Sequence, residues 1–501
     1  MKRTLLLITV IFVAGAFAMS ASAQTGGQNS TAKMRSNLNV PESNATKGSN
    51  VGDGGGTPTE IEALKSRIEE LEKQNRTVLE MLAKVQTQLD AMNHPTNSNQ
   101  SAALTSAPRT AESNAPNPNS QSAASNKNQP VTWGELIGEG NKIKLYGFLR
   151  LDLIADSQRP NNAQSILFIT SPDPRIGTDN GNFTMHPRLT RLGIDWNGPQ
   201  IAKLGDPKLT GKLETDFQNG GSESRQIIRI RHAYLRLDWK KFSILGGQTW
   251  DVVSPLFPTV NTDTLQWNTG NVGDRRPQLR FTYEPQFGGG KFSFAGALAL
   301  TGAIDALDLD GNGVRDGEES GRPQIQGRVG YSHPLGAKDR IMSFGISGQY
   351  GYLKTAKAIV GRTDFRSQIV NIDFTVPINS RFGFKGEGWW GRNMSDIRGG
   401  AGQGINLATG REIRGRGGWI EINGKVWRYL SINPGFSIDD PFDVDIPVGG
   451  RTRNRAFFVA NRITPGGNFV IGVDYLRWQT TFKGFLRGND NRLNLFLQYN
   501  F

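Results

Sequence analysis

A twelve-residue segment has the spacing of a calcium-binding loop. Between Asp308 and Glu319, side chains with oxygen atoms occupy positions 1, 3, 5, 9 and 12, and Gly313 occupies position 6. In such loops the glycine permits a sharp turn, position 7 binds through its backbone carbonyl, and the last glutamate binds through both oxygens. We therefore expect a weak structural calcium site and no other cofactor, with an acidic surface loop that binds no ion as the alternative. The ligands would be Asp308, Asp310, Asn312, Val314, Asp316 and Glu319.

Candidates for catalytic chemistry are few. The chain has no cysteine, and its four histidines are His94, His186, His232 and His333. These histidines are far apart in the sequence, and no serine, histidine and aspartate spacing or metal-binding histidine pair accompanies them. We therefore expect that the protein is not an enzyme.

Arginine is the other residue with a clear chemical use. Lysine and arginine together number 58 against 45 acidic residues, which leaves a formal net charge of +13. An arginine side chain presents a planar fork of donors that matches carboxylate or phosphate, and it keeps its charge at neutral pH. Nucleic acid or anionic lipid would suit such a charge. In the exported barrel predicted below, however, the commoner use is an anion-attracting lumen, and we expect no nucleic-acid partner.

Alternating polarity is the main structural signal after about residue 142. At the end of the chain Leu493, Leu495, Leu497, Tyr499 and Phe501 alternate with mostly polar residues. A period of two places one face of each strand in lipid and the other in a wet lumen. An aromatic last residue behind such a strand also resembles the C-terminal signal of outer-membrane barrels. The fold class is thus an all-β transmembrane barrel.

We count about 16 antiparallel strands, joined alternately by long loops and short turns. A barrel of that size is wide enough to hold an aqueous channel. Long connections at 155–187, 218–227, 250–276, 302–322, 392–415 and 438–453 would lie outside the cell. The expected strands are 143–154, 188–197, 208–217, 228–239, 242–249, 277–285, 290–301, 323–333, 341–353, 366–376, 381–391, 416–428, 429–437, 454–463, 467–479 and 491–501.

Strand parity selects the residues that would face the lumen. A bulge near His232 is needed to bring the basic residues on both sides of it to one face. Asp152, Glu214 and Glu387 are the acidic counterparts. Each basic residue would either attract anions or pair with a neighbouring acid. The pore-lining, anion-selecting candidates are Arg150, Arg191, Lys212, Arg229, Arg231, Arg236, Arg280, Arg328 and Lys385.

Two further expectations concern the barrel. The connection from Trp250 to Arg276 mixes apolar residues with prolines, which is easier to explain if the loop folds inward and constricts the pore. Six tryptophans near predicted strand ends would mark the membrane interfaces. They are Trp239, Trp389, Trp390, Trp419, Trp427 and Trp478.

The N-terminal quarter of the chain divides into four segments. Residues 1–23 have a basic start, an apolar stretch and an Ala-Ser-Ala site typical of a signal peptide, and 24–56 are Ser, Asn and Gly-rich and are expected to be disordered. Residues 57–92 begin with a capping box and continue through five heptads, which predicts an α-helical coiled coil; an amphipathic helix on its own barrel is the alternative. Residues 93–130 would be a flexible linker before the barrel at 131–501.

The segments 229–235 (RIRHAYL) and 247–250 (GQTW) resemble the corresponding stretch of DcaP-like porins. That family is also similar in its N-terminal coiled coil, low-complexity linker and sixteen-stranded barrel, and is related in type to phosphate-selective porins. The resemblance implies a homotrimer that takes up small anions such as dicarboxylates, and it places Arg229, Arg231 and Trp250 in the pore region. The first loop and the calcium-like loop have no match in the family.

We therefore predict an outer-membrane porin for passive diffusion of small hydrophilic, preferably anionic solutes through an arginine-rich pore, exported by its signal peptide. The alternative is a structural barrel that tethers the envelope, with the coiled coil as periplasmic spacer. Deleting residues 24–130 would separate the two, because a porin should still conduct. Expected partners are outer-membrane lipid and lipopolysaccharide, two further copies of the chain, small anions and peptidoglycan.

Overall fold

The computed structural model describes residues 141–163, 166–177, 179–222, 224–260, 265–336 and 340–501. The predicted signal peptide, disordered segment, coiled coil and linker lie outside the described residues. No helix in the described part of the chain is long and apolar enough to cross a membrane.

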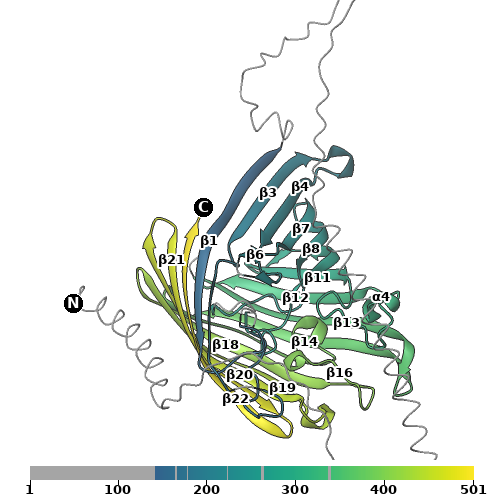
Figure 1. The fold of residues 1–501 in the computed structure, drawn as a ribbon. Coiled ribbons are helices and arrows are strands. Elements are labelled where there is room, and N and C mark those ends of the chain that lie inside the picture. Colours follow the sequence, from purple (N-terminus) through teal and green to yellow (C-terminus); the bar gives the residue numbers. More distant parts are fainter. Residues whose placement is uncertain (1–140, 164–165, 178, 223, 261–264, 337–339) are drawn as a thin grey trace, which may run out of the picture. The chain divides into compact units, whose positions relative to one another are not determined.

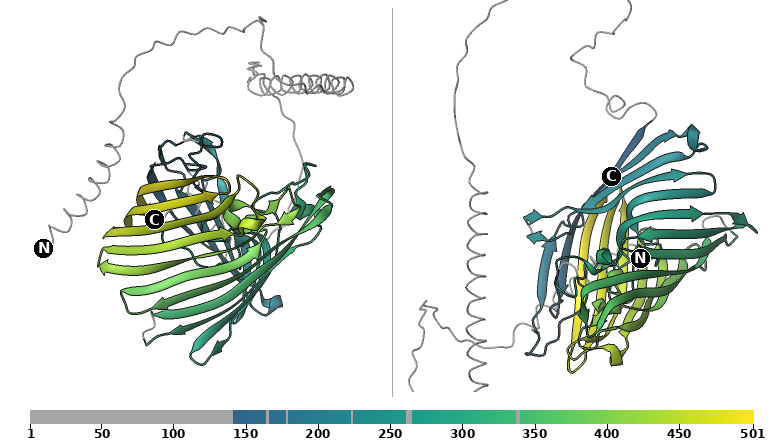
Figure 2. Two further views of the ribbon diagram at one scale, coloured as in Figure 1. Left: turned by 90° about the horizontal axis from the view of Figure 1, so that it is seen from below. Right: turned by 90° about the vertical axis from the view of Figure 1, so that its right-hand side faces the viewer.

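The described residues form one antiparallel sheet that closes on itself (Figures 1 and 2). Closure joins the first strand to the last, from Phe148 opposite Asn500 to Asp156 opposite Arg492. The sheet holds β1 (Lys142–Asp156), β2 (Asn182–His186), β3 (Arg191–Gln200), β4 (Lys208–Asp216), β7 (Arg229–Asp238), β8 (Phe242–Trp250), β9 (Arg275–Tyr283), β10 (Gln286–Phe287), β11 (Gly290–Ala299), β12 (Gln324–Pro334), β13 (Ile341–Ile359), β14 (Arg362–Pro377), β15 (Phe382–Arg392), β18 (Arg414–Trp427), β19 (Leu430–Pro441), β20 (Arg451–Gly466), β21 (Phe469–Phe482) and β22 (Phe485–Asn500).

The barrel has sixteen traverses, as the alternation predicts. The sheet contains 18 strands, but β2 and β3 pair with successive halves of β1, and β9 and β10 both pair with β11. Each of these two pairs of strands therefore makes a single traverse, which leaves a closed barrel of 16 antiparallel strands.

Burial separates the two faces of the wall. Leu149, Leu235 and Ile325 are 58%, 56% and 54% exposed on the outer face, whereas Asp152 and Asp474 are fully buried on the inner face. A soluble protein would show the opposite distribution, and the outward apolar residues match the lipid-facing band of a membrane barrel.

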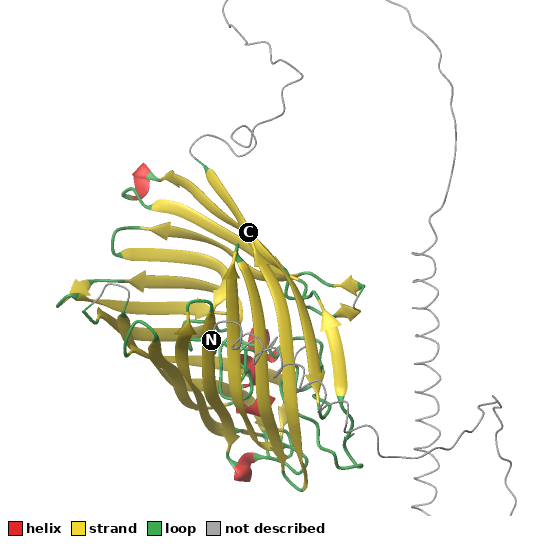
Figure 3. Ribbon diagram, turned by 90° about the vertical axis from the view of Figure 1, so that its left-hand side faces the viewer, coloured by secondary structure: helices red, strands yellow, loops and turns green. Residues whose placement is uncertain are grey.

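Most connections follow the predicted alternation. Long connections lie at one edge of the barrel and short turns at the other, as Figure 3 shows, and the short helices and helical turns occur within the connections. Two connections at the long-loop edge are tight turns instead, at Val360–Gly361 and at Lys483–Gly484, because β13, β14, β21 and β22 extend beyond their predicted ends. Gly361 and Gly484 have φ of 77° and 78°, a left-handed conformation that favours glycine in such turns.

The remaining elements are short. They are η1 (Ala202–Leu204), β5 (Gly221–Ser222) with β6 (Arg225–Gln226), α4 (Asp316–Glu319), η2 (Ser395–Ile397), η3 (Gly400–Gly402), β16 (Ile405–Asn406) with β17 (Arg411–Glu412), and η4 (Asp443–Asp445).

The predicted bulge is present in β7. The register with β4 shifts between Glu214, which lies opposite His232, and Thr215, which lies opposite Ile230. Arg231 is therefore the extra residue, and its side chain reaches inward to Glu214 and Asp216. The bulge brings basic residues on both sides of it to the lumen.

The prediction for the tryptophans is wrong for three of the six. Trp389, Trp419 and Trp478 are 2%, 3% and 0% exposed and lie on the inner face, where connections from other strands pack on Trp389 and Trp478. Trp390 and Trp427, at 57% and 43% exposure, have the outward position expected of interface residues. Trp389 and Trp390 are consecutive residues of β15, but they lie on opposite faces of the wall because successive side chains of a strand alternate.

Candidate functional site

The connection between β8 and β9, residues 251–274, folds into the barrel. Near its ends, Val253 and Val272 are completely buried, and Val260 in its middle is 1% exposed. The two ends pack in one inner cluster with Ile369, Trp389, Met394 and Ile397, and the middle packs in a second with Ile166, Ile169, Ala456, Phe458, Ala460, Leu476 and Trp478. The apolar side chains that suggested an inward loop therefore bind it to the inner wall.

Hydrogen bonds hold the same loop to strands β15 and β18, distant in sequence from its own. The Glu387 carboxylate accepts hydrogen bonds from the Ser254 hydroxyl and from the Leu256 N–H, the latter at 2.9 Å. Trp389 Nε1 donates to the Gly270 carbonyl at 2.7 Å, and Lys385 Nζ donates to the Phe257 carbonyl at 2.8 Å. Glu387, predicted as an acidic partner for lumen bases, instead anchors the loop.

A second connection, between β1 and β2, also enters the barrel. Ile166 and Ile169 are fully buried in the cluster around Val260. Asn454 Nδ2 on β20 donates to the carbonyls of Leu167 and Asn268, both at 2.7 Å, and so joins the two loops. The apolar run from Ile166 to Ile169 in this otherwise polar connection was a signal for such packing, but sequence reasoning did not use it.

Basic side chains line the wall formed by β1, β3, β4 and β7 as a connected ladder. Lys212 Nζ donates to the Tyr146 hydroxyl at 2.8 Å, and that hydroxyl donates to Glu214 Oε2 at 2.8 Å. Arg231 links Glu214 to Asp216, with contacts of 2.7 and 2.9 Å. Arg229 and Arg191 complete the ladder by contacting Asp216 at 2.7 Å and Glu214 at 3.5 Å.

Eight of the nine predicted basic residues contact a carboxylate among the described residues. Besides the ladder, the pairs are Arg150 with Asp152 (2.7 Å), Lys212 with Asp195 (2.5 Å), Arg236 with Asp238 (2.6 Å), Arg328 with Asp373 (2.6 Å) and Lys385 with Glu421 (3.4 Å). Each of these eight residues therefore agrees with the alternative expectation, in which a basic residue pairs with a neighbouring acid.

Arg280 on β9 is the exception. Its guanidinium donates to Gln278 Oε1 at 3.0 and 2.8 Å and to the Trp250 carbonyl, and no carboxylate of the described chain lies within ion-pair distance. The seven predicted bases on β1 to β9 thus share five carboxylates, which leaves an excess charge of +2 among these groups. The bases are Arg150, Arg191, Lys212, Arg229, Arg231, Arg236 and Arg280, and the acids are Asp152, Asp195, Glu214, Asp216 and Asp238.

An aromatic cluster marks the root of the inward loop. Trp250 lies 4.4 Å from Phe257 and 6.3 Å from Trp267, measured between ring centroids. The Arg275 guanidinium lies 4.4 Å above the Trp250 ring, and that of Arg398 lies 5.0 Å above Trp267. Both arginines also contact Asp274, at 3.3 and 2.9 Å, so cation–π contacts and one shared carboxylate hold them at the loop. Sequence reasoning identified Trp250 but not its partners.

A buried ion-pair network joins the loop root to the connection after β15. Arg276 contacts Asp251 and Asp396, both at 2.7 Å, and all three side chains are almost inaccessible. Nearby, Ser395 Oγ donates to Asp305 Oδ2 at 2.6 Å. Burial raises the pKa of Asp305 to about 6, and the charge of Asp396 adds to the shift. Loop contacts are therefore sensitive to protonation at this position.

The calcium-like segment brings three of its acidic residues together. Carboxylate oxygens of Asp308, Asp310 and Asp316 lie within 4.8 Å of one another. The Gly313 N–H donates to Asp308 Oδ2 at 2.9 Å, and Asn312 Nδ2 donates to Glu319 Oε2 at 3.2 Å, so the segment curls around its oxygen atoms. The last four positions, 316–319, form α4. The arrangement suits a hard cation that prefers oxygen ligands.

The three described histidines lie apart from one another. His186, His232 and His333 lie on β2, β7 and β12. His232 Nδ1 is 3.0 Å from the Thr249 hydroxyl, and His333 Nδ1 is 3.3 Å from the Tyr331 hydroxyl. His232 Nε2 also lies 3.9 Å from Glu214 Oε1, so a hydroxyl and a carboxylate flank this one imidazole.

Comparisons with known proteins agree with this architecture. The model of the DcaP outer membrane protein family matches residues 63–283. The crystal structure of the outer membrane channel DcaP of Acinetobacter baumannii is similar with a TM-score of 0.58 at 18% identity, covering 72% of this chain and 98% of that one. An anion-selective porin from Comamonas acidovorans is matched with a TM-score of 0.48 at 11% identity, over 72% and 100% of the two chains. No curated protein sequence matches the chain.

The family match includes the segments 229–235 and 247–250 on which the resemblance was based. The likeness to the solved DcaP channel extends over the barrel and shows a common fold. The resemblance to the DcaP outer membrane protein family is therefore confirmed, and the chain has the β-barrel fold of the solved DcaP channel.

Proposed function

We propose that the chain is a porin through which small hydrophilic solutes diffuse passively, with a preference for anions of the dicarboxylate type. The observation that carries the proposal is the basic excess on the inner wall of β1 to β9, on which Arg280 has no carboxylate partner among the described residues. Across the lumen, the inward loop narrows the passage from the side of β15 to β20. A solute must therefore pass between the loop and a wall with excess positive charge.

The ion pairs position the basic groups without removing their effect on a passing ion. Arg231 is held by Glu214 and Asp216, and these acids in turn hold Arg191 and Arg229, so the guanidinium groups stay in place while solute passes. Preorganised donors avoid the entropic cost of ordering long side chains around each solute. Because most of the charge is compensated, attraction stays weak enough for release, which conduction requires.

Planar-bilayer conductance of the refolded mature chain tests the proposal. A salt gradient gives the reversal potential, and addition of a four-carbon dicarboxylate tests for block of the current. We expect a reversal potential of the sign for anion preference, and block by the dicarboxylate but not by a neutral diol of the same length. Ohmic current with cation preference would contradict the proposed anion preference. Absence of current from a folded barrel would contradict the proposed porin function.

We further propose that the chain assembles as a homotrimer, as the family resemblance implies. Conductance should then close in groups of three equal steps. Cross-linking in mild detergent, followed by mass measurement, gives an independent count of chains.

The 308–319 loop is proposed to bind calcium, on the basis of its ligand spacing and the convergence of Asp308, Asp310 and Asp316. The ion would stiffen an extracellular loop and take no part in transport. Calorimetry on the full chain should detect binding at millimolar calcium, which the Asp308→Ala variant should lose. The Asp443→Ala variant, changed at an acid of another loop, serves as control. Equal binding by Asp308→Ala and the wild-type chain would contradict the site.

A further inference from the structure

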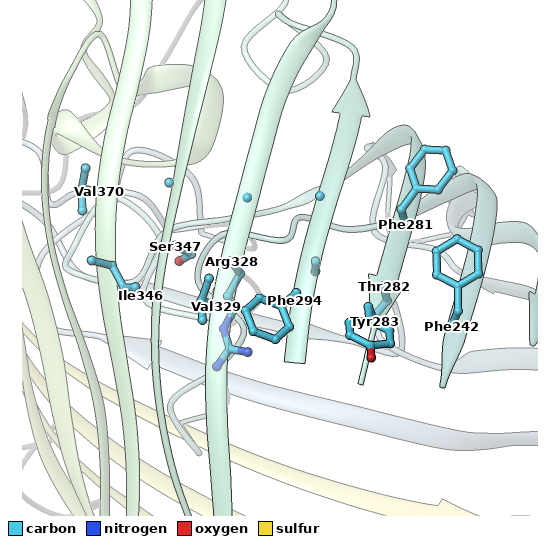
Figure 4. A pocket seen from close by; sticks show the side chains of 14 residues that line it. Phe242, Phe281, Thr282, Tyr283, Phe294, Arg328, Val329, Ile346, Ser347 and Val370 are labelled. Carbon is cyan, nitrogen blue, oxygen red and sulfur yellow. The ribbon is translucent and has the colours of Figure 1, made fainter. Parts of the chain in front are cut away.

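A groove of about 650 Å³ runs across the outer face of β8 to β14. Its floor is a row of glycines, in which Gly296 lies opposite Gly327 and Gly327 opposite Gly348. Figure 4 shows Phe242 and Phe281 at one end of the groove and Ile346 and Val370 at the other. The groove is therefore an apolar channel open to the membrane.

The packing of the barrel requires only one of these glycines, Gly348, where an added Cβ atom would lie 2.9 Å from the Ile369 carbonyl oxygen. A Cβ atom added at Gly296 would meet nothing closer than 4.0 Å, and one added at Gly327 nothing closer than 3.9 Å. Both residues lie within regular strands and neither has a positive φ. Larger apolar side chains would fit there and would fill the groove, so the glycines leave room for an external group.

A second hollow, of about 410 Å³, adjoins the groove and shares Val370 with it. Tyr350 and Trp390 also line it, and two arginines, Arg392 and Arg414, stand at its edge. In the strand register Gln368 lies opposite Arg392, and Arg392 opposite Arg414, so the polar edge is one cross-strand row towards the long loops. The combined cavity is apolar along its length and basic at one end.

Two arginines at this end have guanidinium groups that form no ion pair with any described residue. Arg392 Nε donates to Gln368 Oε1 at 2.5 Å, and Arg366 meets the Glu412 carboxylate only through its backbone N–H, at 3.2 Å. The Arg366 guanidinium lies 5.9 Å from the centroid of the Tyr350 ring. Arg414 contacts Asp445 at 2.7 Å. Lipid-facing arginine costs about 2–4 kcal/mol at the bilayer midplane and about 0–1 kcal/mol near the interface, so this row lies at the head-group level.

We propose that the two hollows form one binding site for an anionic phospholipid-like amphiphile, specifically the phosphorylated glycolipid (lipid A) of the outer leaflet. Its phosphate would take the donors of Arg366 and Arg392, since a guanidinium fork matches phosphate oxygens. One acyl chain would pass over Val370 and lie on the glycine floor between the aromatic and aliphatic walls. The site depends on placement in the outer membrane and is independent of solute preference in the lumen.

Native mass spectrometry of the mature full chain in detergent, titrated with diphosphoryl lipid A, tests the site. Arg366→Gln/Arg392→Gln removes the phosphate donors, and Gly327→Leu fills the groove. We expect each variant to bind the first lipid A about tenfold more weakly than the wild-type chain, which corresponds to about 1.4 kcal/mol. Arg340→Gln/Arg381→Gln at the short-turn edge and Gly246→Leu, on β8 outside the groove, are the matched controls and should bind as the wild-type chain does.

Heat-modifiable migration in gels verifies that each variant barrel is folded before the titration. Unchanged binding by both test variants would overturn the proposal. So would equal affinity of the wild-type chain for lipid A and for zwitterionic phosphatidylethanolamine, because the arginines would then contribute nothing. If Gly327→Leu changed the number of chains per particle and left lipid binding intact, the groove would be an interface between copies, and the lipid assignment would be wrong.

Discussion

Replacing Arg280 by glutamine should reduce anion preference without disturbing the barrel. The side chain is half-buried on β9 and is hydrogen-bonded to Gln278 and to the Trp250 carbonyl. Gln278 Nε2 also donates to that carbonyl at 3.0 Å, so the carbonyl keeps a partner in the variant. The substitution therefore removes one uncompensated lumen charge and little else.

The size of the effect follows from Coulomb's law. A monovalent ion that passes about 5 Å from the guanidinium in water has an interaction energy of about 0.8 kcal/mol, which screening at 0.1 M salt lowers to about 0.5 kcal/mol. That energy enriches an anion about 2.3-fold and depletes a cation about 2.3-fold. The ratio of anion to cation permeability should consequently fall about fivefold in the variant.

The assay is the reversal potential across a planar bilayer in a potassium chloride gradient. Arg455→Gln is a matched control, since Arg455 Nε donates to Gln479 Oε1 at 2.9 Å much as Arg280 does to Gln278, but on the outer face. It removes the same formal charge outside the lumen. If the two variants shift the reversal potential equally, the inner wall of β1 to β9 does not set the selectivity.

Three further outcomes follow from the structure. Trp389→Phe leaves the buried Gly270 carbonyl without its donor, which costs about 1–3 kcal/mol; single-channel current should become noisier as the inward loop detaches, whereas exposed Trp390→Phe should not alter it. Because the pKa of Asp305 is raised in the folded protein, its contribution to stability is complete below the ordinary aspartate pKa and is lost as pH rises through about 6. Asp305→Asn should accordingly flatten the thermal stability of the barrel between pH 5 and 7.5, and an unchanged pH profile would contradict the assignment. A chain lacking residues 24–130 should still conduct, because residues of the barrel build the wall of the proposed pore; loss of current from a folded barrel would contradict this.

Features that depend on the two-residue period of a strand can be predicted from the sequence. Strand number, strand parity and the inward position of residues such as Arg150 and Arg236 follow from alternation, because neighbouring side chains of a strand must point to opposite faces. The β7 bulge was readable for the same reason, since the basic residues before and after His232 could share a face only if one residue were inserted. The inward course of residues 251–274 was signalled by apolar residues that a surface loop would expose.

Ion pairs between residues of different strands could not be predicted from the sequence. Asp216, Asp373 and Glu421 follow the inward parity rule, yet only the register shows that they compensate Arg229, Arg328 and Lys385. Register depends on the closure of the whole sheet, which local alternation does not specify.

The amino-acid pattern alone thus specified a sixteen-stranded wall with a polar inner face, because polarity along a strand is a local property. Tertiary structure decided which charges remain free, where the loops narrow the lumen and which outer face is hollow. Arg280 differs from its neighbours only through what lies beside it after the barrel has closed. Likewise, Gly296, Gly327 and Gly348 form a groove only because three separate strands place them in one row.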